Sequence, residues 1–111
     1  MDKLMHYKSL VRQIVSEIAT EIKLKDIENL LILDDERGHY LFFTDGWRNG
    51  SRQYGCVVHV EVKDNGKIWL RRDGTDLDIG QQLLDADVPK NDIVLGFHSP
   101  KMREFSDFAL A

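Results

Sequence analysis

The chain has 111 residues, a formal charge of −4 and a hydrophobic content of 42%. This length is typical of one domain, so we expect a single domain over residues 1–111. A single cysteine excludes an internal disulfide, and no segment has the pattern of a signal peptide or a membrane span. We therefore expect a cytoplasmic protein with no membrane attachment, and the acidic balance argues against a protein that coats DNA.

The charge is unevenly distributed along the chain. Residues 1–45 carry six basic and nine acidic side chains, whereas residues 73–111 carry three and eight. Between them, residues 46–72 carry six basic and two acidic side chains. If the protein contacts an anionic or acidic partner, the middle segment is where we expect that contact, although a solvated sheet face would show the same bias.

The first half of the chain predicts one helix followed by two strands. Apolar residues recur every three or four positions from Leu4 to Ile22, which predicts an amphipathic helix with Asp2 as its N-cap. The segment IENLLILD (27–34) is typical of a strand, DDERG (34–38) of a turn, and HYLFFTDGW (39–47) of a second strand.

A third and a fourth strand are predicted to form a hairpin. Alternation from Tyr54 to Lys63 places Cys56 on the buried face together with Val58, Val60 and Val62, where we expect an inert thiol. The sequence DNGK (64–67) contains the Asn-Gly pair that suits a tight turn, so KIWLRR (67–72) should return antiparallel.

The last third predicts a second helix and a fifth strand. Thr75 and Asp78 have the spacing of a capping box, ahead of a helix that runs to about Asp87 and ends before Pro89. DIVLGF (92–97) is typical of a strand. The fold class is therefore α+β: a mostly antiparallel sheet of about five strands, with an N-terminal helix and a second helix before the last strand.

The segment GWRNGSRQYG (46–55) is the strongest candidate for a binding surface. As a glycine-rich connection between strands it combines Trp47 and Tyr54 with Arg48 and Arg52, a mixture that suits protein hot spots and nucleic-acid sites alike. Arg71 and Arg72, on the basic hairpin, are expected nearby. If their strand is regular they point to opposite faces and cannot line one phosphate site without a bulge. In the acidic segment that follows, residues 73–78, helix capping is favoured over phosphate binding.

Catalytic and metal sites have weaker support. Asp45, Glu61 and Lys63 could form a Mg²⁺-dependent nuclease centre, but alternating charges on a solvated strand generate the same Glu-x-Lys triplet. The four histidines lack the spacing of a zinc site, and neither a P-loop nor a dinucleotide fingerprint is present. We assign no catalytic, metal or cofactor residues, and expect no cofactor.

Several longer blocks resemble the XisI family, the cyanobacterial fdxN element excision controlling factors. The similarity lies in MDKLMHYKSLVRQIV, DDERGHYLFFTDGW, YGCVVHVEVKDNGKIWLRRDGTD and LLDADVPKNDIVLGFHSP, and covers nearly the whole chain in order. Such a resemblance implies an accessory role in the removal of a DNA element during heterocyst differentiation. It also implies that a separate recombinase exchanges the strands, and that an XisH-like protein is the partner.

Three functions follow from these observations. The first is a non-catalytic controlling factor that binds an XisH-like protein through Trp47, Arg48, Arg52, Tyr54, Arg71 and Arg72, with indirect or weak DNA contact. The second is direct DNA binding by the same residues, and the third is the nuclease. Self-association is a further expectation, because the C-terminal residues Phe105, Phe108 and Leu110 could close the core or cross to a second copy.

Overall fold

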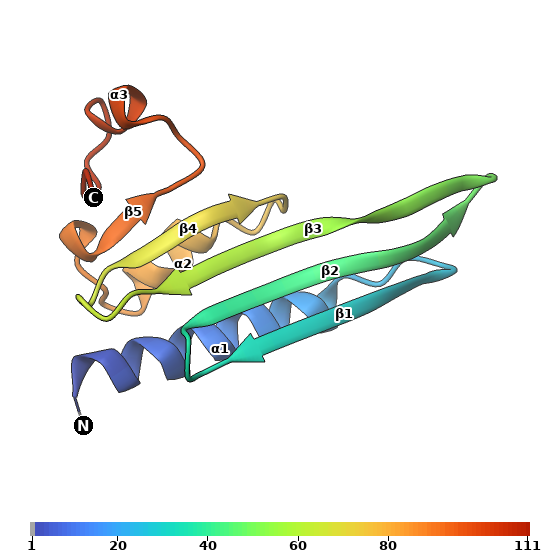
Figure 1. Ribbon diagram of the computed structural model, residues 1–111, viewed down its shortest axis with the longest axis horizontal. Coiled ribbons are helices and arrows are strands. Elements are labelled where there is room, and N and C mark those ends of the chain that lie inside the picture. Colours follow the sequence, from blue (N-terminus) through green and yellow to red (C-terminus); the bar gives the residue numbers. More distant parts are fainter. Residues whose placement is uncertain (1) are drawn as a thin grey trace.

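The computed structural model describes residues 2–111, which form one five-stranded sheet with helices (Figure 1). The strands lie in the order β1-β2-β3-β4-β5; neighbouring strands are antiparallel except β4 and β5, which are parallel. The α+β class and the mostly antiparallel sheet are therefore confirmed. In chain order the elements are α1 (Lys3–Glu21), β1 (Ile27–Asp34), β2 (His39–Arg48), β3 (Ser51–Val62), β4 (Ile68–Asp73), α2 (Ile79–Asp85), the 3-10 turn η1 (Lys90–Asp92), β5 (Ile93–Leu95) and α3 (Pro100–Arg103).

Helix α1 forms where the apolar periodicity predicts it, within one residue at each end. The Asp2 carboxylate accepts a hydrogen bond from the backbone N–H of Met5 at 2.8 Å, which confirms the N-cap. The apolar stripe of the helix is buried against the sheet: Tyr7, Val11, Ile14, Val15 and Ile18. Burial of such a stripe is the main source of helix stability in a protein of this size.

The core lies between the helices and one face of the sheet. Alternate residues of the central strands are buried there: Tyr40, Phe42, Val58, Val60, Val62, Ile68 and Leu70. On β1, the Asn29 side chain donates to the Ala19 carbonyl at 2.9 Å, so it ties the edge strand to the end of α1. Because β1, β2 and β3 share this geometry, their remaining side chains project from the opposite face.

The segment 46–55 is not the glycine-rich loop that the sequence predicts. Instead the β2–β3 ladder continues to the pair Arg48 and Ser51, and only Asn49 and Gly50 form the turn. Both have positive φ, 52° and 79°, which a two-residue hairpin turn requires and which Asn-Gly tolerates. The prediction overlooked this second Asn-Gly turn, and the result is a long hairpin that extends beyond the helices (Figure 1).

A β-bulge in β3 overturns the predicted position of Cys56. Phe42 pairs with Val58 but Phe43 pairs with Cys56, so Val57 is the extra residue. The insertion shifts the alternation by one position, and therefore Cys56 does not share the buried face of Val58. Its thiol is half-buried, donates to the Val58 carbonyl at 3.3 Å, and has a pKa raised by that burial.

The step after β4 uses a different cap from the predicted Thr75–Asp78 box. Helix α2 begins four residues after Thr75, with Asp78 as its N-cap. The Asp73 carboxylate accepts hydrogen bonds from the backbone N–H groups of Thr75 and Ile79 and from the Thr75 hydroxyl. An acidic side chain of the protein therefore fills the place where a phosphate would bind.

The C-terminal segment packs onto β5, which is shorter than the predicted strand 92–97. Ala109 donates its N–H to the Ile93 carbonyl at 2.9 Å, and Phe108 packs against the core. Phe105 and Leu110 stay exposed, so the end of the chain closes the core only in part. In residues 2–111, no helix has both the length and the apolar character needed to cross a membrane.

A polar contact at Asp92 joins α1 to the end of the sheet. The Tyr7 hydroxyl donates to the buried Asp92 carboxylate at 2.6 Å, and the Lys3 ammonium lies 2.8 Å from it. Burial, followed by this hydrogen bond, raises the pKa of Tyr7 to about 12. The contact therefore connects the first turns of α1 with η1, which are far apart in sequence.

We predict that Tyr7→Phe lowers the free energy of unfolding by about 1–2 kcal/mol, because it leaves the buried Asp92 carboxylate without its hydroxyl donor. Urea unfolding followed by circular dichroism measures this change. Tyr54→Phe is the matched control, because the Tyr54 ring is exposed and its hydroxyl lies outside the core. Equal effects of the two substitutions would contradict the role of the Asp92 contact.

Candidate protein-interaction surface

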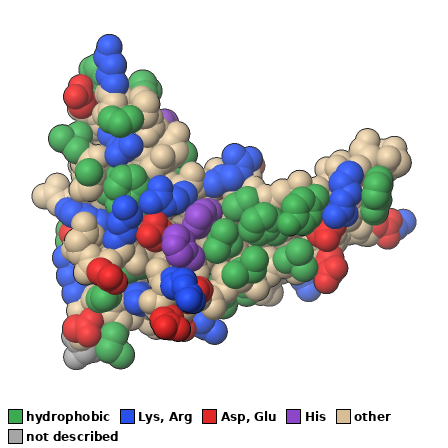
Figure 2. Space-filling view, viewed as in Figure 1, with side chains coloured by type: hydrophobic (Ala, Val, Ile, Leu, Met, Phe, Trp, Pro, Cys, Tyr) green, Lys and Arg blue, Asp and Glu red, His purple; other side chains and the backbone are tan. Residues whose placement is uncertain are grey.

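The sheet face opposite α1 and α2, here called the open face, carries an apolar surface in its middle. Strand pairing places on it an apolar group, the open-face patch, which consists of Leu30, Ile32, Leu41, Phe43, Tyr54 and Cys56. Figure 2 shows this face, where apolar side chains gather over the hairpin beside histidine side chains. Ile32 is 49% exposed and Tyr54 58% exposed, so this apolar surface is in contact with solvent.

At the far end of the hairpin, aromatic and charged side chains form a second group on the same face. We call Asp45, Trp47, Arg52 and Tyr54 the tip cluster; Tyr54 belongs to this cluster and to the open-face patch. The Arg52 guanidinium lies 5.6 Å from the Trp47 ring centroid and 5.2 Å from that of Tyr54, and it pairs with the Asp45 carboxylate. Trp47 is 60% exposed. The structure therefore brings together three of the residues predicted to form the binding surface.

At the other end of the open-face patch lies a group whose members were not predicted to come together. This base cluster consists of His39, His59, Glu61, Lys63, Trp69, Arg71 and Arg103. Arg71 donates to Glu61 Oε1 from Nε at 2.9 Å and from Nη2 at 2.7 Å. Three cations lie over the Trp69 ring, at 4.5 Å for Lys63, 4.9 Å for Arg71 and 5.1 Å for Arg103.

The ionisation of the base cluster follows from its contacts. Burial alone would raise the pKa of Glu61, but the hydrogen bonds and charge of Arg71 outweigh it and hold that pKa below its usual value. The His59 ring lies 3.1 Å from the His39 ring, nitrogen to nitrogen. Burial, then the neighbouring His39 and Arg71, lowers the pKa of His59. Glu61 and Arg71 therefore form a charged pair at neutral pH.

Arg71 does not lie near the tip cluster, contrary to expectation, and Arg72 reaches only the middle of β3. Arg72 pairs with His59 and Leu70 with Val60, so Arg71 is the extra residue of a bulge in β4. Arg71 is held by Glu61, whereas the Arg72 Nε donates to the Cys56 carbonyl at 2.7 Å. His59 and Arg52 are seven positions apart on β3, which is roughly 20 Å along the strand. Four of the six predicted residues therefore lie at the end of the hairpin, Arg71 lies at the base cluster, and Arg72 reaches the middle of β3.

Arg48 differs from the other predicted tip residues. It is exposed, ends β2, and follows Trp47 in a regular strand, so its side chain projects from the opposite side of the hairpin. A partner that grips the hairpin end could contact both sides of it.

The residues proposed for a nuclease centre are also separated. Asp45 pairs with Tyr54 across the ladder, whereas Glu61 pairs with His39, again roughly 20 Å away along β3. Each carboxylate is held by an arginine, Arg52 and Arg71 respectively. Among residues 2–111 no group of three metal-ligating side chains converges. Asp45 and Glu61 therefore cannot hold one metal ion between them in this fold.

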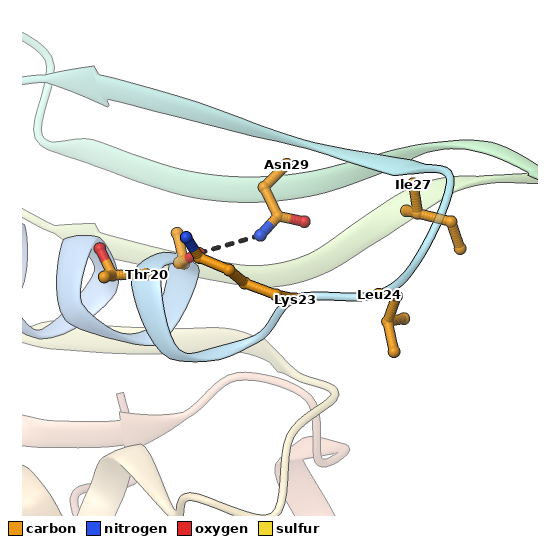
Figure 3. Close-up of a pocket in the computed structure, with 6 residues that line it drawn as sticks. Thr20, Lys23, Leu24, Ile27 and Asn29 are labelled. Carbon is orange, nitrogen blue, oxygen red and sulfur yellow. Dashed lines mark hydrogen bonds between the residues drawn. The ribbon is translucent and has the colours of Figure 1, made fainter.

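Two hollows of the surface are lined by side chains that also stabilise the fold. One of about 420 Å³ lies between the end of α1 and β1, where Figure 3 shows Asn29 turned toward the helix end. Its amide is used to satisfy helix carbonyls. Another, of about 290 Å³, is lined by Asp73 and Asp78, whose carboxylates cap α2, and by Leu84 and Phe108 of the core side.

Fold and surface together define a small α+β protein whose sheet is covered by helices on one face and displays charged and apolar groups on the other. The sequence model of the XisI protein family matches residues 1–110, and the chain belongs to that family. No curated protein sequence matches the chain.

Two solved structures share the fold over nearly its full length. One is a XisI-like protein from Anabaena variabilis ATCC 29413, with 39% sequence identity and a TM-score of 0.89, covering 97% of this chain and 99% of its own. The other is the fdxN element excision controlling factor XisI from the same organism, with 35% identity and a TM-score of 0.86, covering 99% of this chain and 100% of its own. The resemblance proposed from the sequence is thus confirmed.

We predict that the Glu61–Arg71 pair makes stability depend on acid pH. Since the folded-state pKa of Glu61 lies below its ordinary value of 4.5, its contribution is present above that value and is lost as the pH falls through the folded-state pKa. Glu61→Gln should flatten the fall in unfolding free energy over this acid range. Urea titrations at about pH 6 and about pH 3 measure how far the unfolding free energy falls between the two pH values. Glu104→Gln, at an exposed residue near the C-terminus, is the control. The same fall in unfolding free energy in Glu61→Gln and in the wild-type protein would contradict the role given to the Glu61–Arg71 pair.

Proposed function

We propose that this protein is a non-catalytic accessory factor in the control of DNA excision, and that it acts by binding another protein through the end of its long hairpin. The proposal rests on membership of the XisI family and on similarity to a protein described as an excision controlling factor. An XisH-like protein is the proposed partner. Recombination chemistry is then left to a separate enzyme.

The observation that carries the proposal is the exposed tip cluster on a projecting hairpin. Trp47 and Tyr54 keep more than half of their surface in solvent, although each has a large apolar ring. Stacking by Arg52 holds these rings in a fixed arrangement, which reduces the entropy lost when a partner binds. Trp, Tyr and Arg are the residues most enriched at the energetic centres of protein interfaces.

We predict that the double substitution Trp47→Ala and Arg48→Ala weakens binding of the XisH-like partner at least tenfold. The reason is the loss of an aromatic anchor and an uncompensated guanidinium, each of the kind that contributes about 1 kcal/mol or more at an interface. Titration calorimetry or pull-down with the purified partner measures the change.

Lys101→Ala with Met102→Ala is the matched control, because it also removes one exposed basic and one exposed apolar side chain, but from α3. Partner binding that is equally weakened in both double variants, or in neither, would remove the hairpin end from the proposed contact surface. Thermal unfolding of both variants verifies that they remain folded.

Direct DNA binding is the competing function, and the pairing of charges in the structure weighs against it. Of the predicted basic residues, Arg52 pairs with Asp45 and Arg71 with Glu61, so fewer cations remain to neutralise phosphates. A DNA contact made by several cations weakens steeply as salt rises, whereas a contact centred on aromatic rings does not. Gel shift at low salt with no retardation would reject the DNA function. Retardation that disappears between about 50 and 200 mM salt would support it against the proposal.

A further inference from the structure

The two edges of the sheet differ in how they are protected. β5 has three residues, and the C-terminal segment lies beside it, where Ala109 donates its N–H to the Ile93 carbonyl at 2.9 Å. β1 is the other edge strand and has eight residues, all of which pair with β2 (Figure 1). Within residues 2–111, no group outside β2 forms a hydrogen bond with the backbone of residues 28–33. Alternate N–H and C=O groups of β1 therefore face outward along a free edge.

β1 lacks most of the features that keep a free edge from pairing with another chain. Such features are prolines, lysines, bulges and short length. The sequence IENLLILD (27–34) contains neither proline nor lysine, and its register with β2 is continuous. Two apolar side chains in its middle project to opposite faces and stay exposed, Leu31 at 40% and Ile32 at 49%. A strand added at this edge would therefore gain apolar contacts on both faces.

A hollow on the helix side of β1 gives an added strand further room. It has a volume of about 420 Å³, lies where α1 ends, and is bordered by Leu24 and by Ile27 and Asn29 of β1 (Figure 3). Leu24 is 44% exposed. A side chain that projects to this side from a strand beside β1 can enter the hollow and contact the Leu24 and Ile27 side chains.

The charges along the edge define the chemistry of the strand that fits it. Glu28 and Asp34 lie on the open face of β1, near its two ends, and Leu30 and Ile32 lie between them on the same face. In an antiparallel pair, residues directly opposite one another project from the same face and their side chains interact. A complementary strand thus carries basic residues opposite the two carboxylates and apolar residues opposite Leu30 and Ile32.

A second copy of β1 does not have this chemistry. When two antiparallel copies extend one sheet about a two-fold axis, each side chain keeps its face, so even-numbered residues stand opposite even-numbered ones. The two registers that align most of β1 set Glu28 opposite Asp34 in one case, and Asp34 against Asp26 in the other. Carboxylates therefore meet at both ends in either register, and like charges placed opposite one another are destabilising.

We propose that β1 is the docking site for an extended segment of a different protein, which adds to the sheet as one further strand antiparallel to β1. Backbone hydrogen bonds along the edge contribute affinity for any such segment, and the side chains determine which segment fits. On its open-face side, the segment carries a basic, an apolar, an apolar and a basic residue in turn. The site is separate from the end of the hairpin, because the β1–β2 ladder ends at Gly46, before Trp47.

NMR titration of the ¹⁵N-labelled, full-length protein with a synthetic peptide tests this site. The capped peptide Lys-Thr-Val-Val-Val-Thr-Lys has the required pattern and reads the same in both directions. Amide signals of residues 28–33 should shift, with a dissociation constant below about 1 mM. The same peptide with Glu in place of both Lys should bind at least tenfold more weakly. No shift of these signals at about 1 mM basic peptide, or equal binding of the two peptides, would overturn the proposal.

Leu31→Lys tests the edge itself, because a lysine on an edge strand opposes pairing. Since Leu31 is 40% exposed, the substitution is compatible with the fold, and it should weaken binding of the basic peptide at least tenfold. Met102→Lys, at a residue of α3 that is 52% exposed, adds the same charge and is the matched control. Equal weakening in both variants, or in neither, would show that the peptide does not bind along β1.

Glu28→Lys tests the charge pattern. This variant should bind the basic peptide more weakly and the acidic peptide more strongly than the wild-type protein does. Glu104→Lys makes the same change at another exposed residue and should leave the ratio of the two affinities unchanged. The wild-type ratio in Glu28→Lys would contradict the proposed pairing. Thermal unfolding verifies that each variant is folded.

Two further measurements separate this proposal from its alternatives. Light scattering on the free protein identifies a second copy as the occupant if the wild-type protein is a dimer that Leu31→Lys dissociates, and that result would overturn the proposal. The double variant Trp47→Ala and Arg48→Ala should bind the basic peptide as the wild-type protein does, because the hairpin end lies beyond β1. Its binding to the XisH-like partner reports separately on the proposed function.

Discussion

The bulge at Val57 decides what the open face displays. A regular β3 would keep Cys56 on the side of Val58, Val60 and Val62, and would turn Tyr54 and Arg52 toward the helices with it. The inserted residue divides the strand into two halves: even-numbered residues face the core before β3 ends, but face the open side in the half near the turn. The half near β4 buries its valines in the core, and the half near the turn directs Arg52, Tyr54 and Cys56 to the open face. The tip and base clusters share one face for this reason.

Element lengths explain why the hairpin projects beyond the helices. Helix α1 has 19 residues and is about 28 Å long, whereas β3 has 12 residues and extends about 40 Å. A single helix of this length cannot cover the whole hairpin even on its own side. Trp47 and Arg52 therefore lie beyond the core, where stacking and the Asp45 pair hold them instead of burial. Order at the tip comes from the ladder and these local contacts.

Local signals predicted most elements of the fold and few of its contacts between strands. Periodicity identified α1 and alternation identified the strands, because burial on one face leaves those patterns in the sequence. A bulge leaves no such pattern, so the face of Cys56 was predicted wrongly. Composition identified Trp47, Arg52 and Tyr54 as a group, since a short turn keeps them together. The base cluster was not predicted, because its members are far apart in sequence. His39 meets His59 through the pairing of β2 with β3, and Arg103 of α3 reaches Trp69 of β4.

The pairing of charges also changes what the basic middle segment means. Counted along the chain, residues 46–72 carry an excess of four positive charges. In the structure Asp45, from outside the segment, pairs with Arg52, whereas Glu61, the partner of Arg71, is already included in the count, so pairing lowers the excess only from four to three. What remains is a sequence of ion pairs, aromatic rings and aliphatic side chains along one face. Such a surface discriminates partners by the order of its charges and by shape, because like charges placed opposite one another are costly. A surface of that kind suits a folded protein better than a polyanion of uniform charge.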